Sequence, residues 1–238
     1  MTADRGRLPD KPATGNEVDA FLRQLAATPA VRPAAGRRGR LLFALDATAS
    51  RQPTWDRACH IQAEMFKETA ALGGLDVQLA FYRGFGEFEA SAWFDCADDL
   101  LKKMTAVSCL GGKTQVGKVL KHALAESKQA KINAVVFVGD CMEEDIDVLC
   151  HKAGQLGLLG VPVFIFHEGR DRKAAAAFRQ IAQLTHGACC PFDSSSAQQL
   201  RELLSAVAVY AAGGRPALED YSRRASGATL LLTQIAKS

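Results

Sequence analysis

The stretch LLFALDATAS, residues 41–50, joins a run of apolar residues to three closely spaced oxygen-bearing side chains. Its apolar part, residues 41–45, has the length and composition of a buried β-strand. Asp46, Thr48 and Ser50 follow at intervals of two residues. A buried strand that ends in a carboxylate and two hydroxyls predicts a polar site at the carboxyl end of that strand.

A second apolar segment, INAVVFVGD at residues 132–140, also ends in an aspartate, Asp140. Such a continuous apolar run is typical of a strand that is covered on both faces of a parallel sheet. Ligands of open α/β sheets bind beyond the carboxyl ends of the strands, at the point where the strand order reverses. If the two strands are central neighbours, Asp46 and Asp140 meet at that point. Thr114, which lies in the segment GGKT just before a predicted helix, is expected to join them.

Predicted strands alternate with predicted helices through most of the chain, which indicates an α/β fold with a mainly parallel sheet. The strand patterns at residues 76–84 and 87–94 are too close together for a crossover helix, so these strands are expected to form an antiparallel hairpin. With helices on both faces, the expected architecture is a Rossmann-like doubly wound fold with one antiparallel edge strand. The predicted helices cover residues 53–74, 96–107, 115–129, 143–160, 171–187, 196–214 and 217–238.

The composition is that of an ordinary globular protein, with 238 residues of which 48% are hydrophobic and 23% charged. The net charge of +3 is too weak to indicate nucleic-acid binding, and several basic residues are confined to residues 31–40. Seven cysteines without a CxxC motif argue against a disulfide framework and favour a reducing compartment. No secretory signal or membrane span is recognisable. We therefore expect a cytoplasmic protein that binds neither nucleic acid nor membrane.

Two alternative interpretations of the polar residues fit less well. A phosphate-binding loop requires GxxxxGK[ST] directly after a strand, whereas Val107 stands at the first glycine position and a predicted helix precedes GGKT. An aspartyl nucleophile at Asp46 would normally have a second carboxylate two residues later as its general acid, and Thr48 stands there. Neither a nucleotide site nor a covalent phosphatase is therefore expected.

Carboxylates and hydroxyls without His or Cys form a hard-oxygen site, which suits Mg²⁺, Mn²⁺ or Ca²⁺ rather than zinc. The pattern Asp46-x-Thr48-x-Ser50, followed by Thr114 and then Asp140, resembles the metal-ion-dependent adhesion site (MIDAS) of von Willebrand factor A (VWA) domains. Thr48 stands where Ser is commoner, but it keeps the hydroxyl group.

The resemblance covers about residues 39–212. Residues 1–38 would be an N-terminal tail with a short helix and a basic linker, and residues 213–238 a C-terminal helical extension. The resemblance implies a six-stranded sheet with a Mg²⁺ or Mn²⁺ ion on its top face.

The family pattern also implies roles for the five candidate metal ligands. Ser50, Thr48 and Thr114 would bind the ion directly or nearly so. Asp46 and Asp140 would often act through water or hydrogen bonds. An ion held by neutral hydroxyls keeps an affinity for one more anionic oxygen, which a partner's Asp or Glu can supply.

The predicted function is a divalent-metal-dependent protein-binding module that captures an exposed Asp or Glu of a protein partner. The resemblance suggests a cytoplasmic multiprotein or AAA+ ATPase-associated assembly. No nucleophile–base pair is evident near the site, so we expect no catalysis. A metal-assisted phosphoryl hydrolase and a structural scaffold with an empty site remain open as alternatives. Residues 81–89, FYRGFGEFE, are either a plain hairpin loop or a rim that contacts the partner.

Overall fold

The computed structural model describes residues 15–28, 38–69, 74–192 and 197–224. Its strands form one six-stranded sheet with the order β3-β2-β1-β4-β5-β6. β2 and β3 pair antiparallel, and the other neighbouring strands pair parallel. The expected mainly parallel α/β sheet with one antiparallel edge strand is confirmed. The strands are Gly39–Asp46 (β1), Leu75–Arg83 (β2), Glu87–Phe94 (β3), Ala134–Gly139 (β4), Val163–Glu168 (β5) and Cys189–Phe192 (β6).

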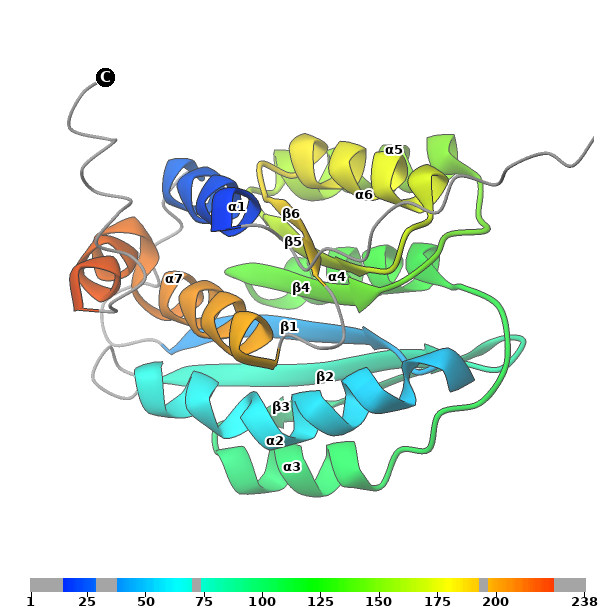
Figure 1. The fold of residues 1–238 in the computed structure, drawn as a ribbon, viewed down its shortest axis with the longest axis horizontal. Helices are drawn as coiled ribbons and strands as arrows, with labels where there is room; N and C mark the ends of the chain where they lie inside the picture. The colour runs from blue at the N-terminus through cyan, green and yellow to red at the C-terminus, as the bar shows by residue number, and fades with distance from the viewer. Residues whose placement is uncertain (1–14, 29–37, 70–73, 193–196, 225–238) are drawn as a thin grey trace, which may run out of the picture.

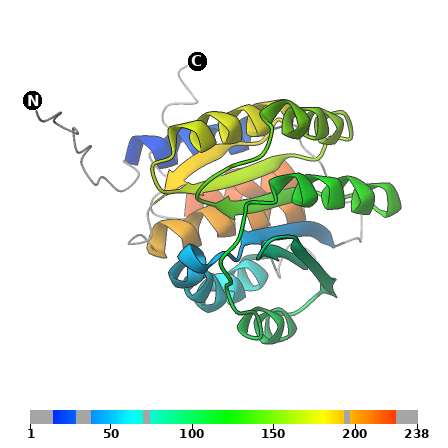
Figure 2. The same cartoon turned by 90° about the vertical axis from the view of Figure 1, so that its right-hand side faces the viewer.

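Helices cover both faces of this sheet. Buried residues of α1, α2, α3 and α7 pack on one face, and those of α4, α5 and α6 pack on the other. The views in Figures 1 and 2 show the sheet between these two layers. The helices are Gly15–Ala27 (α1), Gln52–Thr69 (α2), Ala97–Thr105 (α3), Val116–Gln129 (α4), Ile146–Leu158 (α5), Arg172–Leu184 (α6) and Ala197–Arg224 (α7), with a short 3-10 turn at Ala49–Arg51 (η1).

The packing of β1 explains why its residues 41–45 are all apolar. Leu41, Phe43 and Leu45 belong to the core under α1, α2, α3 and α7. Leu42 and Ala44 point the other way, into the core under α4, α5 and α6. Successive side chains of a strand alternate between its faces, so a strand that is covered on both sides needs apolar residues throughout.

The strand order reverses between β1 and β4. β1 pairs with β2 on one side and with β4 on the other, and its last residue pair with β4 joins Leu45 to Val138. Asp46 is the last residue of β1, and Asp140 follows directly after β4. The two aspartates therefore lie at the carboxyl ends of adjacent parallel strands, as the sequence predicted.

Helix α1 packs onto the same core as the central sheet. The Phe21 ring lies 6.1 Å from the ring of Phe164 and 5.4 Å from that of Phe166, measured between centroids. Leu25 is also fully buried. This helix belongs to the segment 1–38 that we expected outside the VWA-like unit, and the boundaries of that unit remain a prediction.

Helix α7 extends beyond residue 212 and is interrupted near the expected place. Gly214 has a φ of 68° inside it, and Pro216 follows in the next turn. Glycine tolerates this left-handed conformation, and proline is compatible with the first turn of a restarting helix. The predicted helix at 217–238 is seen only as far as Arg224, since its remaining residues, like the tail at 1–14 and most of the basic linker, lie outside the described residues.

None of the helices in the described part of the chain is both long and apolar enough to cross a bilayer.

Two glycines of α5 provide a matched test of how closely this helix packs. A Cβ atom added at Gly157 would lie 2.1 Å from the carbonyl oxygen of Leu184, whereas one added at Gly154 would meet nothing within 4 Å. We expect Gly157→Ala to lower the free energy of unfolding by about 1–3 kcal/mol. Gly154→Ala should raise it by about 0.5–1 kcal/mol, because Ala favours the helix. Urea denaturation followed by circular dichroism measures both, and equal stabilities would contradict the close packing.

Candidate metal centre

Asp46 is buried, with 2% of its surface exposed, and both of its carboxylate oxygens accept hydrogen bonds. The backbone N–H of Thr48 donates to Oδ1 at 2.7 Å, and the hydroxyl of Tyr82 donates to Oδ2 at 3.1 Å. The first of these bonds folds the chain back over the carboxylate directly after the strand, as Asp side chains commonly do in turns. Tyr82, on β2, is a neighbour of the site that sequence reasoning missed.

Four of the five predicted ligands lie in one connected group. The hydroxyl oxygens of Thr48 and Ser50 are 3.4 Å apart, and Ser50 donates to Oδ2 of Asp140 at 3.1 Å. Together with the bond between Asp46 and Thr48, these contacts connect the end of β1 with the end of β4. The predicted convergence of these four residues therefore matches the geometry of the structure.

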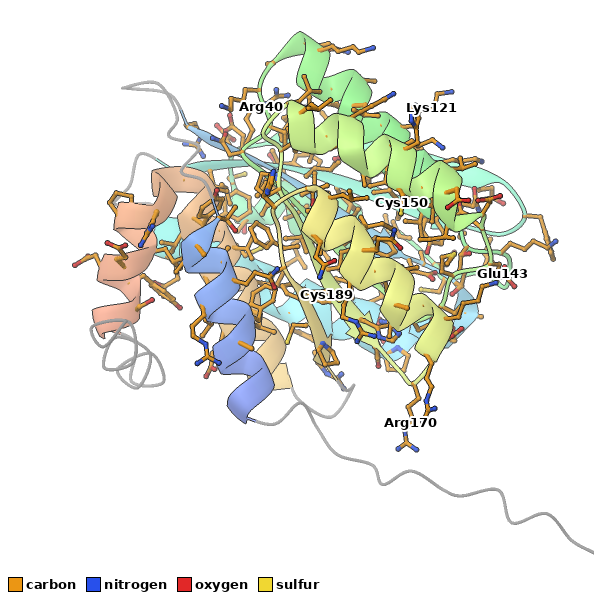
Figure 3. The ribbon with its side chains drawn as sticks, turned by 90° about the horizontal axis from the view of Figure 1, so that it is seen from above. Arg40, Lys121, Glu143, Cys150, Arg170 and Cys189 are labelled. Atoms are coloured by element: carbon orange, nitrogen blue, oxygen red, sulfur yellow. The ribbon has the colours of Figure 1, made fainter. Side chains whose placement is uncertain are left out.

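Thr114, the fifth predicted ligand, makes no hydrogen bond to the other four within the described residues and is instead hydrogen-bonded to Glu143. Its hydroxyl accepts from the backbone N–H of Glu143 at 3.0 Å, and its own N–H lies 3.3 Å from a carboxylate oxygen of that residue. Glu143 stands three residues after Asp140, near the start of α5 (Figure 3). Thr114 is thus fastened to the loop that carries Asp140.

That loop departs from the sequence prediction. We expected a helix from residue 143, but α5 begins at Ile146, because the Asp145 side chain accepts the first free backbone N–H groups as its N-cap. Glu144 instead reaches across to the start of α4, where its carboxylate accepts the N–H groups of Val116 at 2.5 Å and Gly117 at 2.8 Å. This long-range cap fixes the helix that begins directly after Thr114.

The β2–β3 hairpin supports the GGKT loop from the other side. The N–H of Lys113 donates to the Gly84 carbonyl at 3.0 Å, and the Gln115 side chain donates to the Arg83 carbonyl at 3.1 Å. Phe85, at the tip of this hairpin, is 85% exposed. The turn is therefore held by several bonds and still presents an aromatic ring to solvent.

The electrostatics of the site favour a cation. Burial raises the pKa of Asp46, and the charge of Asp140 raises it further, while the hydrogen bonds from Thr48 and Tyr82 oppose this rise. Oδ1 of Asp140 is buried and has no hydrogen-bond partner among the residues that the structure describes. Buried polar atoms are nearly always satisfied, so an unsatisfied oxygen beside a second buried carboxylate fits a site for a positive ion.

The chemistry of the donor atoms also restricts which ion fits. Across the described residues, no three or more His, Cys, Asp or Glu side chains gather where they could hold a metal. The candidate centre has two carboxylates, and its other donors are hydroxyls. An all-oxygen set with few charges suits a hard divalent ion such as Mg²⁺, which usually retains several waters. The residues present therefore fit such an ion.

Contacts from β5 complete the surroundings of the site, and sequence reasoning did not find them. The buried Arg51 guanidinium forms an ion pair with Glu168, which also accepts a hydrogen bond from the Thr54 hydroxyl. His167 donates from Nε2 to the carbonyl oxygen of Asp140 at 3.1 Å. Both Glu168 and His167 stand at the carboxyl end of β5, next to β4. Their place at the end of a predicted strand was the feature of the sequence that could have identified them as neighbours of the site.

No protein-family model matches the chain. No curated protein matches it either. Solved structures do match.

The SpRpn10 VWA domain superposes with a TM-score of 0.56 at 14% identity, covering 71% of this chain and 94% of that domain. Proximal thread matrix protein 1 from the mussel byssus, solved with a zinc-occupied MIDAS motif, gives 0.58 at 18% identity and covers 72% and 48%. An aerotolerance-related membrane protein from Bacteroides fragilis gives 0.50 at 15% identity and covers 70% and 98%. At these identities the likeness concerns the fold.

The GGKT loop offers a matched pair of variants next to the site. A Cβ atom at Gly112 would lie 1.9 Å from the carbonyl oxygen of Gly84, whereas one at Gly111 would meet nothing within 4 Å. Gly112→Ala should push the loop away from the hairpin and lower the free energy of unfolding by about 1–3 kcal/mol. Gly111→Ala should leave it within about 0.5 kcal/mol of wild type. Urea denaturation tests this, and a Gly112→Ala protein as stable as its control would show that the contact is not needed.

Proposed function

We propose that this chain, which has the fold of a VWA domain, is a protein-binding module that depends on a divalent metal ion. The ion would be Mg²⁺ or Mn²⁺, and an exposed Asp or Glu of a protein partner would complete its coordination. The residues proposed to hold it are Asp46, Thr48, Ser50, Thr114 and Asp140.

The observation that carries the proposal is the unsatisfied oxygen of Asp140 beside the buried Asp46. A bound divalent ion supplies positive charge to which a carboxylate oxygen can coordinate. Ser50 and Thr48 contribute neutral oxygens, so they add no negative charge that would repel a partner's carboxylate. The fastening of Thr114 to Glu143 keeps the third hydroxyl on the same side of the sheet.

An exposed apolar rim next to this site supports a protein partner over a small solute. Phe85 is 85% exposed and Leu110 is 42% exposed. Leu110 is anchored near the site because its N–H donates to the carbonyl oxygen of Ala47 at 3.0 Å. Aromatic residues are enriched in protein interfaces, and this favours the rim interpretation of residues 81–89.

We propose binding without catalysis. His167 is buried, and its Nε2 is engaged by the backbone carbonyl of Asp140, so this nitrogen is not directed at the Ser50 hydroxyl as a general base would be. The matching structures include a pilus adhesin from Lactobacillus rhamnosus and the SpRpn10 VWA domain. Within the described residues the seven cysteines form no disulfide bond, which fits the proposed cytoplasmic location and a role in a multiprotein or AAA+ ATPase-associated assembly.

Metal binding is the first test. Calorimetric titration of the chain with Mn²⁺ should give a saturable heat, and the melting temperature should rise with the ion because it binds only the folded state. Asp140→Asn should weaken the affinity by at least about tenfold. Asp145→Asn is the matched control, since Asn caps a helix as well as Asp does and should bind the ion normally.

The metal proposal fails if Mn²⁺ and Mg²⁺ change neither heat nor melting temperature, or if the two variants bind alike. Sustained Mg²⁺-dependent turnover of a generic phosphoester that is lost in Asp46→Asn would instead support the hydrolase alternative.

Recognition of a partner carboxylate is the second test. Peptides selected from a random library for binding in Mg²⁺ should be released by a chelator and should lose binding when their Asp or Glu becomes Asn or Gln. Phe85→Ala should weaken the binding free energy of these peptides by about 1–2 kcal/mol, because it removes an exposed aromatic anchor. Leu158→Ala is the control, because Leu158 is 91% exposed but lies at the opposite end of α5 from the metal edge. Binding that survives chelation would contradict the proposed mode.

A further inference from the structure

A groove of about 780 Å³ runs between the outer faces of α4 and α5. These helices lie side by side with α6, and Figure 3 looks onto them and labels Lys121 on α4. The residues that line the groove do not include any of the five proposed metal ligands. This surface is therefore separate from the candidate metal centre.

The floor of the groove is apolar. Leu124 and Ala125 contribute from α4, and Val148 contributes from α5. Leu124 also packs against the core below, so its side chain connects that core to the surface. Val148 lies on the outer face of α5 and is 51% exposed, whereas Leu149 and Leu156 fill the inner face of the same helix. These side chains leave an apolar strip in contact with water.

The rim of the groove is mainly basic. On α4, Lys121 precedes and Lys128 follows the two apolar floor residues along the same face of the helix, and Lys152 stands on α5. Within the described part of the chain, none of these three lysines makes an ion pair within 4 Å. Burial raises the pKa of the nearby Glu144 carboxylate, however, and the charge of Lys152 acts on that carboxylate and opposes the rise. Asp147 is the carboxylate among the lining residues, and its place in the first turn of α5 suits the helix dipole. Positive charge therefore exceeds negative charge along the groove.

The lining residues of α4 follow one another along a single face of that helix, so a second helix could lie alongside them. Lys121, Leu124, Ala125 and Lys128 occupy positions i, i+3, i+4 and i+7, which form one stripe along a helix. Seven residues of helix rise by about 10 Å, or two turns. An amphipathic helix of that length or somewhat longer could lie along the stripe. It would bury its apolar side chains on the floor and keep its polar face in water.

We propose that this groove binds an acidic amphipathic helix of a protein partner. The apolar residues of that helix would contact Leu124, Ala125 and Val148. Its flanking Asp or Glu residues would pair with Lys121, Lys128 and Lys152. The open, two-helix form of the groove favours this ligand over a small molecule, because small-molecule sites enclose most of the ligand surface.

The probe for a direct test is a fluorescein-labelled peptide of about 14 residues that forms an amphipathic helix. It carries leucines at i, i+3, i+4 and i+7 with glutamates on both sides of this stripe. A second peptide has the same leucines and lysines in place of the glutamates. Fluorescence anisotropy with the full chain should show binding of the glutamate peptide, weakened by salt, and much weaker binding of the lysine peptide.

Charge reversal on the protein provides the matched variants. The groove variant combines Lys121→Glu, Lys128→Glu and Lys152→Glu. Its affinity for the glutamate peptide should fall by about tenfold or more, and its affinity for the lysine peptide should rise. The control variant carries the same charge change away from the groove, at exposed positions of other segments. Its substitutions are Lys131→Glu, Arg172→Glu and Lys173→Glu.

Val148→Asn tests the apolar floor separately, because it removes the apolar side chain without adding a charge. It should also weaken binding of the glutamate peptide, with the fold checked by circular dichroism. The proposal is overturned if wild type does not bind the glutamate peptide at about millimolar concentration. Equal binding by the groove and control variants would overturn it as well. Octanoate that binds the groove without displacing the peptide would assign the site to small amphiphilic anions instead.

Discussion

The direct pairing of β1 with β4 at the centre of the sheet brings the buried carboxylate of Asp46 close to the half-buried carboxylate of Asp140. Burying negative charge is expensive unless hydrogen bonds or an opposite charge compensate for it. The surroundings supply part of this compensation, through the N–H of Thr48 and the hydroxyls of Tyr82 and Ser50. The remaining oxygen of Asp140 has no hydrogen-bond partner among the described residues, and this is why we propose a cation site at this edge of the sheet.

The loops around this edge are held by contacts that come from distant parts of the chain. Glu144 caps α4, and Glu143 exchanges two hydrogen bonds with Thr114, so the segments after β4 and before α4 form one unit. Close approach of Gly112 to the Gly84 carbonyl joins the β2–β3 hairpin to the same unit. The ligands of an ion must be positioned before it binds if affinity is not to be lost in ordering them. For the proposed ligands, this network would provide that positioning.

The helices α4 and α5 connect the two surfaces to which we assign binding. Both begin at the metal edge, α4 just after Thr114 and α5 just after Asp145, and both then line the lysine-rimmed groove. The two surfaces differ in chemistry, because one would accept a single carboxylate through a metal ion and the other an extended acidic helix through lysines. A module with two such surfaces on one rigid pair of helices is suited to hold more than one component of an assembly.

The sequence alone determined the class of fold and the strands that carry Asp46 and Asp140, because continuous apolar runs and a short hairpin gap allow few arrangements. It also suggested which hydroxyls lie nearby, since Thr48 and Ser50 follow Asp46 within four residues. Only the tertiary structure decided how Thr114 is held, where α5 begins, and that Tyr82, Glu144 and His167 surround the site. Those contacts join residues far apart in the chain, and local patterns carry no information about which distant partner a polar side chain finds once the sheet has formed.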